Sequence, residues 1–362
     1  MEKTAIREGE IIMNRDIFDE GGPLNIKKIN SDQISMEIRF PLGPDGRVAR
    51  ECPNEACCPG YFKVKSGTGI TKEQGQAYCP YCRFSAAPAA FTTKEQQKYM
   101  TGLIGAEITE GIQQMFEDTF KRGTTNLSRS GGLELHYKRG PKPVVPRPFE
   151  EEVRRDVICP HCGLDHSVFG LAIWCADCGK DIFLTHIEAE YSVLRSMLSD
   201  IGRRRLSLGN RVGAKDLENC LEDTVSIFEA VLRQEARRLM QLQGADIEEI
   251  ENSIRKAGNA FQSISRSTII FDKELGVKLL NSLSEAESIS LENTFEKRHP
   301  ITHNLGIVDK KYIDRARAAE KEGRDVLVTP EEIEAAIVLS MKVFRSVHAI
   351  ECVPKKGKKE TE

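Results

Sequence analysis

Residues 159–179 read CPHCGLDHSVFGLAIWCADCG and decide the local fold of the middle of the chain. Two Cys-x-x-Cys-Gly units stand here, with twelve residues between Cys162 and Cys175. In each unit the glycine lets the backbone turn so that amides point at the thiolates, and two such knuckles complete a tetrahedral site. Because four thiolates fill all four coordination positions, the spacing predicts a structural zinc ion held by Cys159, Cys162, Cys175 and Cys178.

A second cysteine cluster lies earlier in the chain and has a wider first knuckle. It reads Cys52-Pro-Asn-Glu-Ala-Cys57, followed by Cys79-Pro-Tyr-Cys82. The neighbouring Cys58 is a fifth thiol, whereas a four-coordinate ion needs only one of Cys57 and Cys58. We favour Cys57, because Cys58-Pro-Gly is typical of a turn that leaves the knuckle, and Cys58 stays as the alternative. The cluster predicts a second structural zinc ion, held by Cys52, Cys57, Cys79 and Cys82.

Both clusters resemble zinc ribbons, small β modules that are too short to bury a core without the ion. Aromatic and basic residues alternate around the first cluster, at Tyr61, Phe62, Lys63, Lys65, Tyr81, Arg83 and Phe84. This pattern suits a strand of nucleic acid, because bases stack on aromatic rings and phosphates pair with cations. Core aromatic residues beside solvated lysines explain the pattern equally well, so both interpretations stay open.

The composition of the whole chain is that of an ordinary water-soluble protein. The chain has 362 residues, a formal net charge of -3 and 40% hydrophobic residues. This length predicts two or three domains, and the balanced charge excludes a polybasic nucleic-acid binder. No apolar stretch approaches the ~20 residues that a membrane-spanning helix needs. Charges also stand near the start where an export signal is apolar, so we expect a cytoplasmic protein, in which clustered cysteines bind metal rather than form disulfides.

The segments around the first cluster carry strand and helix patterns. Residues 34–40, ISMEIRF, alternate apolar and polar side chains, and GPDG at 43–46 is a turn sequence, which together predict a β-hairpin. Residues 93–122 place apolar side chains at helical spacing and predict one long amphipathic helix, capped by Thr92 or Thr93. Residues 123–150 turn to Gly, Ser and Pro and end in PKPVVPRP, which predicts an extended linker.

The second half of the chain is almost continuously helical in pattern. In 214–243 one stripe of apolar residues recurs at steps of three and four: Leu217, Leu221, Val225, Phe228, Leu232, Ala236 and Leu239. Such a helix needs partners to bury the stripe, and amphipathic segments at 186–202, 247–264, 284–297 and 330–350 supply them. The sequence therefore predicts a bundle of four or five helices.

The predicted architecture is a multidomain α+β protein with two small β zinc-ribbon modules and a C-terminal all-α bundle. The expected segments are an N-terminal β segment with the first ribbon (1–92), the long helix (93–122), the Pro/Gly linker (123–150), the second ribbon (151–184), the bundle (185–350) and a charged tail (351–362).

A candidate active site lies at residues 295–309, FEKRHPITHNLGIVD, where four residues separate Arg298 from His303. An imidazole can exchange a proton with the 2′-hydroxyl or the leaving 5′-oxygen of RNA near neutral pH, and a guanidinium can stabilise charge on the phosphorane. Neither role requires a metal ion. Pro300 cannot lie in a helix interior, so we expect Arg298 to end one helix and His303 to start the next turn or helix.

These residues resemble the signature of the HEPN superfamily, helical bundles that carry an Arg, a polar residue and then a His near a helix start. The similar region covers about residues 184–350 and includes His299 directly after Arg298 and Asn304 directly after His303. The stretch around Glu229 is similar to the earlier HEPN helix that often supplies an acidic residue. The resemblance therefore implies Arg298 and His303 as catalytic residues, with Glu229, His299 and Asn304 as weaker candidates.

The resemblance also implies a function. It implies a metal-independent endoribonuclease that leaves a 2′,3′-cyclic phosphate, acts as a homodimer, and serves as a toxin or defence effector against cellular RNA such as tRNA. The ribbons would then select the RNA or sense a trigger. The alternative is a regulator without catalysis, in which the ribbons bind nucleic acid or a protein and the HEPN-like bundle dimerises. A zinc deaminase is disfavoured, because its zinc needs an open fourth position and a His-x-Glu motif.

Overall fold

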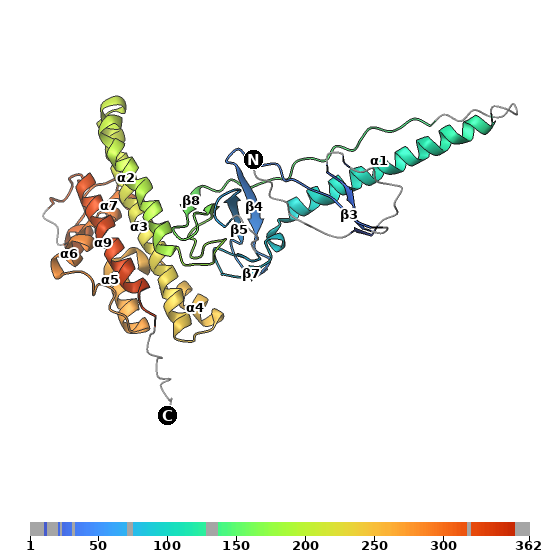
Figure 1. Cartoon of the computed structure of the whole chain (residues 1–362). Helices are drawn as coiled ribbons and strands as arrows, with labels where there is room; N and C mark the ends of the chain where they lie inside the picture. Colours follow the sequence, from blue (N-terminus) through green and yellow to red (C-terminus); the bar gives the residue numbers. More distant parts are fainter. Residues whose placement is uncertain are drawn as a thin grey trace. The chain divides into compact units, whose positions relative to one another are not determined.

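The computed structural model describes residues 11–12, 21, 24–30, 33–70, 75–127, 137–316 and 320–351. The predicted tail beyond 351, part of the predicted linker and most of the first twenty-three residues lie outside these described residues. The chain divides into two compact units, Met1–Ile182 and Phe183–Glu362 (Figure 1). The first mixes strands and helices and the second is helical, which confirms the mixed α and β class and the helical C-terminal region. The division falls two residues before the predicted start of the bundle.

Among the described residues of the first unit, the strands are short and form three sheets. A small sheet has the order β1-β3-β2 and a second, two-stranded sheet pairs β6 with β7. The largest sheet has four strands in the order β4-β5-β9-β8, all antiparallel to their neighbours. The strands are β1 (Ile11–Ile12), β2 (Lys27–Lys28), β3 (Gln33–Ser35), β4 (Arg47–Glu51), β5 (Tyr61–Lys65), β6 (Ala77–Tyr78), β7 (Ser85–Ala86), β8 (Arg155–Ile158) and β9 (Asp165–Val168).

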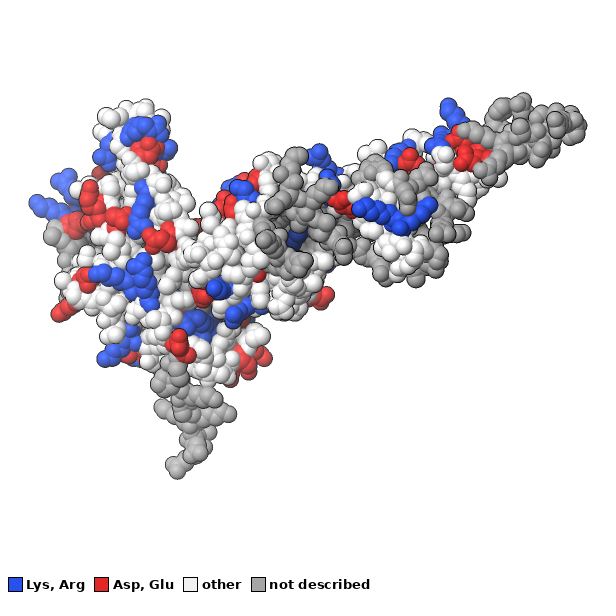
Figure 2. All heavy atoms as spheres, viewed as in Figure 1, with Lys and Arg blue, Asp and Glu red and all other residues white. Residues whose placement is uncertain are grey.

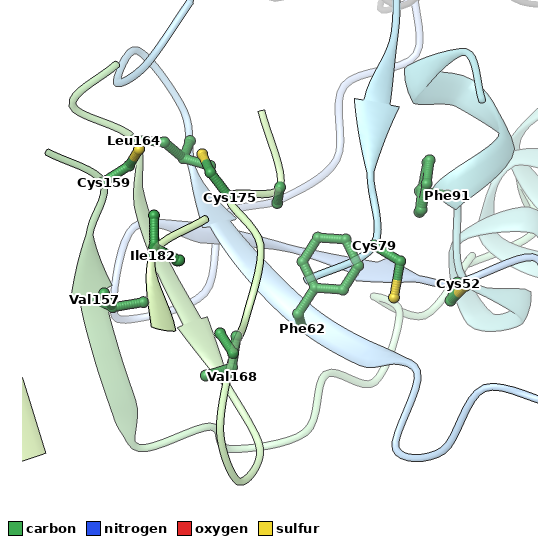
Figure 3. Packing of buried hydrophobic residues seen from close by; sticks show 12 residues of the cluster. Cys52, Phe62, Cys79, Phe91, Val157, Cys159, Leu164, Val168, Cys175 and Ile182 are labelled. Atoms are coloured by element: carbon green, nitrogen blue, oxygen red, sulfur yellow. The ribbon is translucent and has the colours of Figure 1, made fainter. Parts of the chain in front are cut away.

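The four-stranded sheet joins the two cysteine segments, which the sequence predicted as separate modules. Strand β5 leaves the first segment and pairs with β9 of the second, with Phe62 opposite Val168 and Val64 opposite His166. One buried cluster contains Phe62 and Val168 together with cysteines from both segments (Figure 3). The two cysteine segments therefore share one sheet and one buried cluster, which the sequence did not predict.

The prediction that residues 34–40 and the turn at 43–46 form a β-hairpin is wrong. Strand β3 pairs with β1 and β2, whereas β4 pairs with β5. The alternating apolar residues instead contribute to a small core, in which Ile34 is buried. Ile38 packs against this core, as do Leu103 and Ile108 of the long helix.

The long helix α1 (Lys94–Leu127) follows a short 3-10 turn, η1 (Pro88–Phe91). Thr93 caps it, because its hydroxyl accepts a hydrogen bond of 3.1 Å from the Gln96 amide while the Gln96 side chain accepts one from the Thr93 amide. The helix extends five residues into the predicted linker. The described end of that linker has no regular structure, but Lys142 forms ion pairs with Glu107 and Glu110, one turn apart on α1, so the segment contacts the helix there.

The second unit is built from helices. They are α2 (Phe183–Leu208), α3 (Asn210–Leu242), α4 (Ile247–Ala257), η2 (Ala260–Gln262), α5 (Ile264–Ile269), η3 (Ile270–Glu274), α6 (Glu285–Glu296), α7 (Arg298–His303), α8 (Lys310–Ala316) and α9 (Pro330–His348). Local sequence sets several of their starts. Capping boxes at Asp246, Ser284 and Thr329 begin α4, α6 and α9, and Pro330 occupies the first turn of α9 as predicted.

The core of the second unit forms around α3, which packs against α2 and α9 (Figure 1). All seven residues of the predicted stripe on α3 are buried, so that prediction is confirmed. Gly209 makes the turn between α2 and α3 with φ of 99°, a conformation that a side chain would strain. Rings from three helices meet in this core, where Phe228 contacts Phe295 and Phe344 at centroid distances of 5.0 and 5.3 Å.

The surface carries both signs of charge. On the face in Figure 2, basic and acidic side chains are interspersed over the described residues of both units. Among the described helices, none has a stretch long and apolar enough to cross a membrane.

Candidate active site and metal centres

The two cysteine groups have the geometry of metal sites. In the first, the sulfur of Cys52 lies 3.7 Å from that of Cys82, and Cys57 lies 3.6 Å from Cys79. In the second, the corresponding distances are 3.7 Å for Cys159 and Cys178 and 3.5 Å for Cys162 and Cys175. Four sulfurs at ~2.3 Å from a central tetrahedral ion lie about 3.8 Å apart. Both groups can therefore hold a metal ion with four sulfur ligands.

The local backbone supports these groups. Amides of the knuckles point at the sulfurs, as in the contact of 3.4 Å from the Asp177 amide to Cys175 Sγ. Burial raises the pKa of the Cys79 and Cys175 thiols, so buried thiolates need a cation beside them to be stable. Cys57 belongs to the first group, whereas Cys58 is exposed and outside it. The structure thus brings together the eight cysteines that the spacing selected.

The alternating aromatic and basic residues near the first group divide between core and surface. Phe62 and Lys63 are buried, and Lys63 pairs with Glu150 at 3.0 Å. Tyr81 donates a hydrogen bond of 2.7 Å to the carbonyl of Tyr61. Lys65, Arg83 and Phe84 stay exposed, and Arg83 lies over the ring of Trp174 at 4.3 Å. Much of the pattern therefore serves the core of this unit.

The helical unit contains a cavity of about 420 Å³. It lies among η2, α5, α6, α7 and α8, and three of its lining residues are Arg298, His299 and His303. The other charged lining residues are Arg266, Glu292, Glu296, Lys311 and Arg315. Four permanent cations thus outnumber two carboxylates, which makes the cavity a place where an anionic group is stabilised.

Helix α7 positions the three predicted residues differently from the sequence prediction. Arg298 is the first residue of α7 and His303 is the last, so Arg298 begins a helix rather than ending one. Pro300 lies in the first turn of this six-residue helix, where its missing N–H has no helical acceptor in any case. The sequence-based prediction placed Arg298 and His303 on different helices or turns because a proline disrupts a helix interior. In a helix of six residues Pro300 is still in the first turn, so both residues can belong to the same helix.

His299 and His303 lie one turn apart on α7 and form a ring pair with centroids 5.1 Å apart. Burial lowers the pKa of His299 below its usual range, and the positive charge of Lys311 lowers it further. Such an imidazole is neutral near neutral pH and can accept a proton. His303 is exposed and lines the same cavity.

Glu296 was not selected from the sequence, although it lies only two residues before Arg298. Its half-buried carboxyl lines the cavity and is 3.8 Å from the Arg315 guanidinium. Burial raises the pKa of Glu296, against the opposing charge of Arg315. Glu296 is therefore an additional titratable group in the cavity that the two histidines line.

The side chain of Gln262 connects Glu229 to Arg298 by hydrogen bonds. Glu229 does not itself line the cavity. The Gln262 side chain donates a hydrogen bond of 2.7 Å to Glu229 and accepts one of 3.1 Å from Arg298. Arg233 pairs with Glu229 at 2.6 Å on the other side. Glu229 can thus act on Arg298 only by fixing Gln262.

Asn304 is the C-cap residue directly after α7 and is not a lining residue of the cavity. Its side chain donates a hydrogen bond of 2.7 Å to the carbonyl of Ile307, which closes the turn after the helix. Its observed contact is thus a structural one. The charged and polar cavity residues that sequence reasoning missed come from η2, α5, α6 and α8, and apart from Glu296 they have no short spacing to the motif.

Comparison with protein-family models, with curated protein sequences and with solved structures finds no match to this chain.

Proposed function

We propose that the chain is an endoribonuclease that cuts cellular RNA, such as tRNA, without a metal ion at the reacting phosphate, as a toxin or defence effector. The proposal is carried by one observation, that Arg298, His299 and His303 line the same cationic cavity. The resemblance of residues 295–309 to the HEPN signature supports it, and on the same resemblance we propose a homodimer formed through the helical unit.

In the proposed reaction, the 2′-oxygen attacks the adjacent phosphorus and the bond from phosphorus to the 5′-oxygen breaks. The proton of the 2′-hydroxyl passes to one imidazole of the pair His299 and His303, and the other imidazole donates a proton to the leaving 5′-oxygen. Arg298 stabilises the charge that develops on the phosphorane. The products are a 2′,3′-cyclic phosphate and a free 5′-hydroxyl, so atoms and protons balance without water.

We propose zinc as the ion in both cysteine groups. Four thiolates in tetrahedral arrangement suit zinc, and they leave no open position for a substrate, so each ion has a structural role. Cysteine groups of this kind require reduced thiols, which fits a cytoplasmic protein. The metal-binding unit would select the RNA or sense a trigger.

Cleavage of a mixed tRNA and mRNA pool tests the nuclease. Purified wild type, His303→Ala and Thr302→Ala are compared, with EDTA present only during the brief reaction so that structural zinc is retained. Thr302 is the matched control, because it is the neighbouring residue of α7, is exposed and does not line the cavity. We expect cyclic-phosphate ends from wild type and from Thr302→Ala, and a loss of at least about 100-fold in His303→Ala.

The outcome separates the two classes of function. If wild type is inert while it and His303→Ala bind RNA or a protein equally, the chain is a binding regulator and the cavity histidines have no chemical role. If cleavage requires an added divalent ion, the proposal of metal-independent chemistry fails.

A further inference from the structure

Three of the cavity's cations come from outside the Arg/His motif. Lys311 and Arg315 lie one turn apart on α8, so their side chains share a face of that helix. Arg266 comes from α5, and it lines the same cavity. All three are exposed. Arg298 belongs to α7, so positive charge reaches the cavity from three different helices.

Within the cavity, these three cations and Arg298 face two carboxylates, Glu292 and Glu296. Arg315 has one carboxylate partner, Glu296, at the long distance of 3.8 Å, and among the described residues no ion pair involves Arg266 or Lys311. The arginine cluster at the α2–α3 turn is different, since Arg203 and Arg204 each pair with an aspartate at 2.6 Å. A cavity whose cations outnumber its carboxylates keeps a net positive charge, which is the arrangement that binds phosphate oxygens.

The size and lining of the cavity limit what it accepts. A volume of about 420 Å³ lies in the range of pockets that enclose one small molecule, and it cannot admit the full width of a duplex. The imidazole rings of His299 and His303 offer flat surfaces beside it. Unpaired bases commonly enter such sites and stack on aromatic side chains, histidine included.

We propose that Arg266, Lys311 and Arg315 form a second phosphate subsite beside Arg298, so that the cavity takes one unpaired nucleotide of a single-stranded RNA together with the phosphates on both its sides. The inference rests on the proposed function for the identity of the reacting phosphate at Arg298. The proposed subsite holds the neighbouring phosphate with residues of α5 and α8. RNA substrates that lack this second phosphate should therefore bind weakly.

Binding of a fluorescent 2′-O-methyl RNA strand, measured by anisotropy over a range of salt concentrations, tests the subsite. This strand has no 2′-hydroxyl and therefore cannot be cut by the proposed reaction. Wild type is compared with Arg266→Ala, Lys311→Ala and Arg315→Ala, and Lys310→Ala is the matched control because Lys310 is exposed on α8 but does not line the cavity. Lys311→Arg keeps the charge, and thermal unfolding of each variant checks its fold.

We expect each subsite variant to weaken binding about 3- to 10-fold and to reduce the salt slope by roughly 0.7, the value for one phosphate contact on a single strand. Lys310→Ala and Lys311→Arg should bind like wild type, and a duplex of the same sequence should bind at least about 10-fold more weakly. The proposal is overturned if the three variants bind like wild type, if the duplex binds equally well, or if wild type does not bind the strand.

The same proteins, assayed with a cleavable strand, distinguish the two proposals. Cleavage by wild type together with unchanged binding in the variants would reject the subsite and leave the nuclease standing. Weakened binding in the variants without any cleavage would support the subsite and reject the nuclease.

Discussion

The side-chain oxygen of Gln262 accepts a hydrogen bond of 3.1 Å from the guanidinium of Arg298. The amide end of Gln262 is fixed in turn, because it donates a bond of 2.7 Å to Glu229. A glutamine held at both ends restricts the rotation of the arginine that it contacts. The chain therefore orients Arg298 toward the cavity through a residue of η2, 36 positions earlier in the sequence.

Replacing Gln262 with alanine should lower the cleavage rate while leaving the fold intact. The variant removes the acceptor that orients Arg298, and small misplacements of a catalytic group commonly cost about 10- to 100-fold in rate. We expect the loss in kcat rather than in KM, because the anchored charge acts on the phosphorane more than on the bound strand. Steady-state kinetics on a short RNA measure both constants.

Gln241→Ala is the matched control for this prediction, since Gln241 is an exposed glutamine on α3 that does not line the cavity. Equal rates in wild type and Gln262→Ala would show that Arg298 needs no such support.

The pKa of His299 should respond to Lys311. Burial and the nearby ammonium both lower that pKa below its usual value near 6.5, while Asp309 acts in the opposite direction. Removing the positive charge in Lys311→Ala makes protonation easier, so the pKa of His299 should rise. NMR titration of the imidazole protons, assigned with His299→Gln, measures the change. The control Lys310→Ala should leave the pKa of His299 at its wild-type value.

The lowered pKa of His299 should make the stability of the folded chain depend on pH. Because the folded chain binds this proton less readily than the unfolded chain, the free energy of unfolding should fall as the pH drops from 6.5 through the lower folded pKa of His299. A pKa of His299 at or above 6.5 in the folded protein would contradict the assignment of this ring as a neutral proton acceptor.

The sequence predicted the elements that local pattern controls. The stripe on α3 and the start of α9 at Pro330 follow from periodicity and capping, both of which act within a few residues. The hairpin from 34–40 was wrong because alternation shows that one face is covered but does not identify the partner. Nor does pattern show that β5 pairs with β9, about a hundred residues later, since that contact depends on the whole first unit.

The sequence also predicted only some residues of the candidate sites. Cysteine spacing selected the residues of both sulfur groups, because ligand geometry is encoded by short intervals. The motif on α7 supplied Arg298, His299 and His303. Gln262 and Arg315 were missed, because their place in the cavity depends on how separate helices pack. Glu296 was missed although it lies two residues before Arg298, because the sequence does not show that its side chain faces the cavity.

Metal content should depend on Cys57 and not on its neighbour. Cys57→Ser removes one of four sulfurs from the first group, so the purified protein should lose about one zinc ion of two. Cys58→Ser changes an exposed thiol outside the group and should retain both ions. Elemental analysis after extensive dialysis measures the ratio, and loss of zinc in Cys58→Ser with retention in Cys57→Ser would reverse the assignment.

Phe62 should couple the two metal centres. Its buried ring lies in the cluster that contains Cys79 of the first group and Cys175 of the second, and its strand makes the pairing with β9 (Figure 3). Truncation to alanine leaves a cavity and should cost about 3–5 kcal/mol in the free energy of unfolding of the first unit. Because both knuckles pack on the same cluster, we expect Phe62→Ala to release zinc from both groups at lower chelator concentration than wild type.

Phe84→Ala is the control for this last prediction, because Phe84 follows the first group but is 40% exposed. It should change stability by less than about 1 kcal/mol and leave both ions in place. Release of a single ion from Phe62→Ala would mean that the two sulfur groups fold independently in spite of their shared sheet. Simultaneous release, followed with a chromogenic zinc indicator, would mean that both sulfur groups depend on the shared core around Phe62.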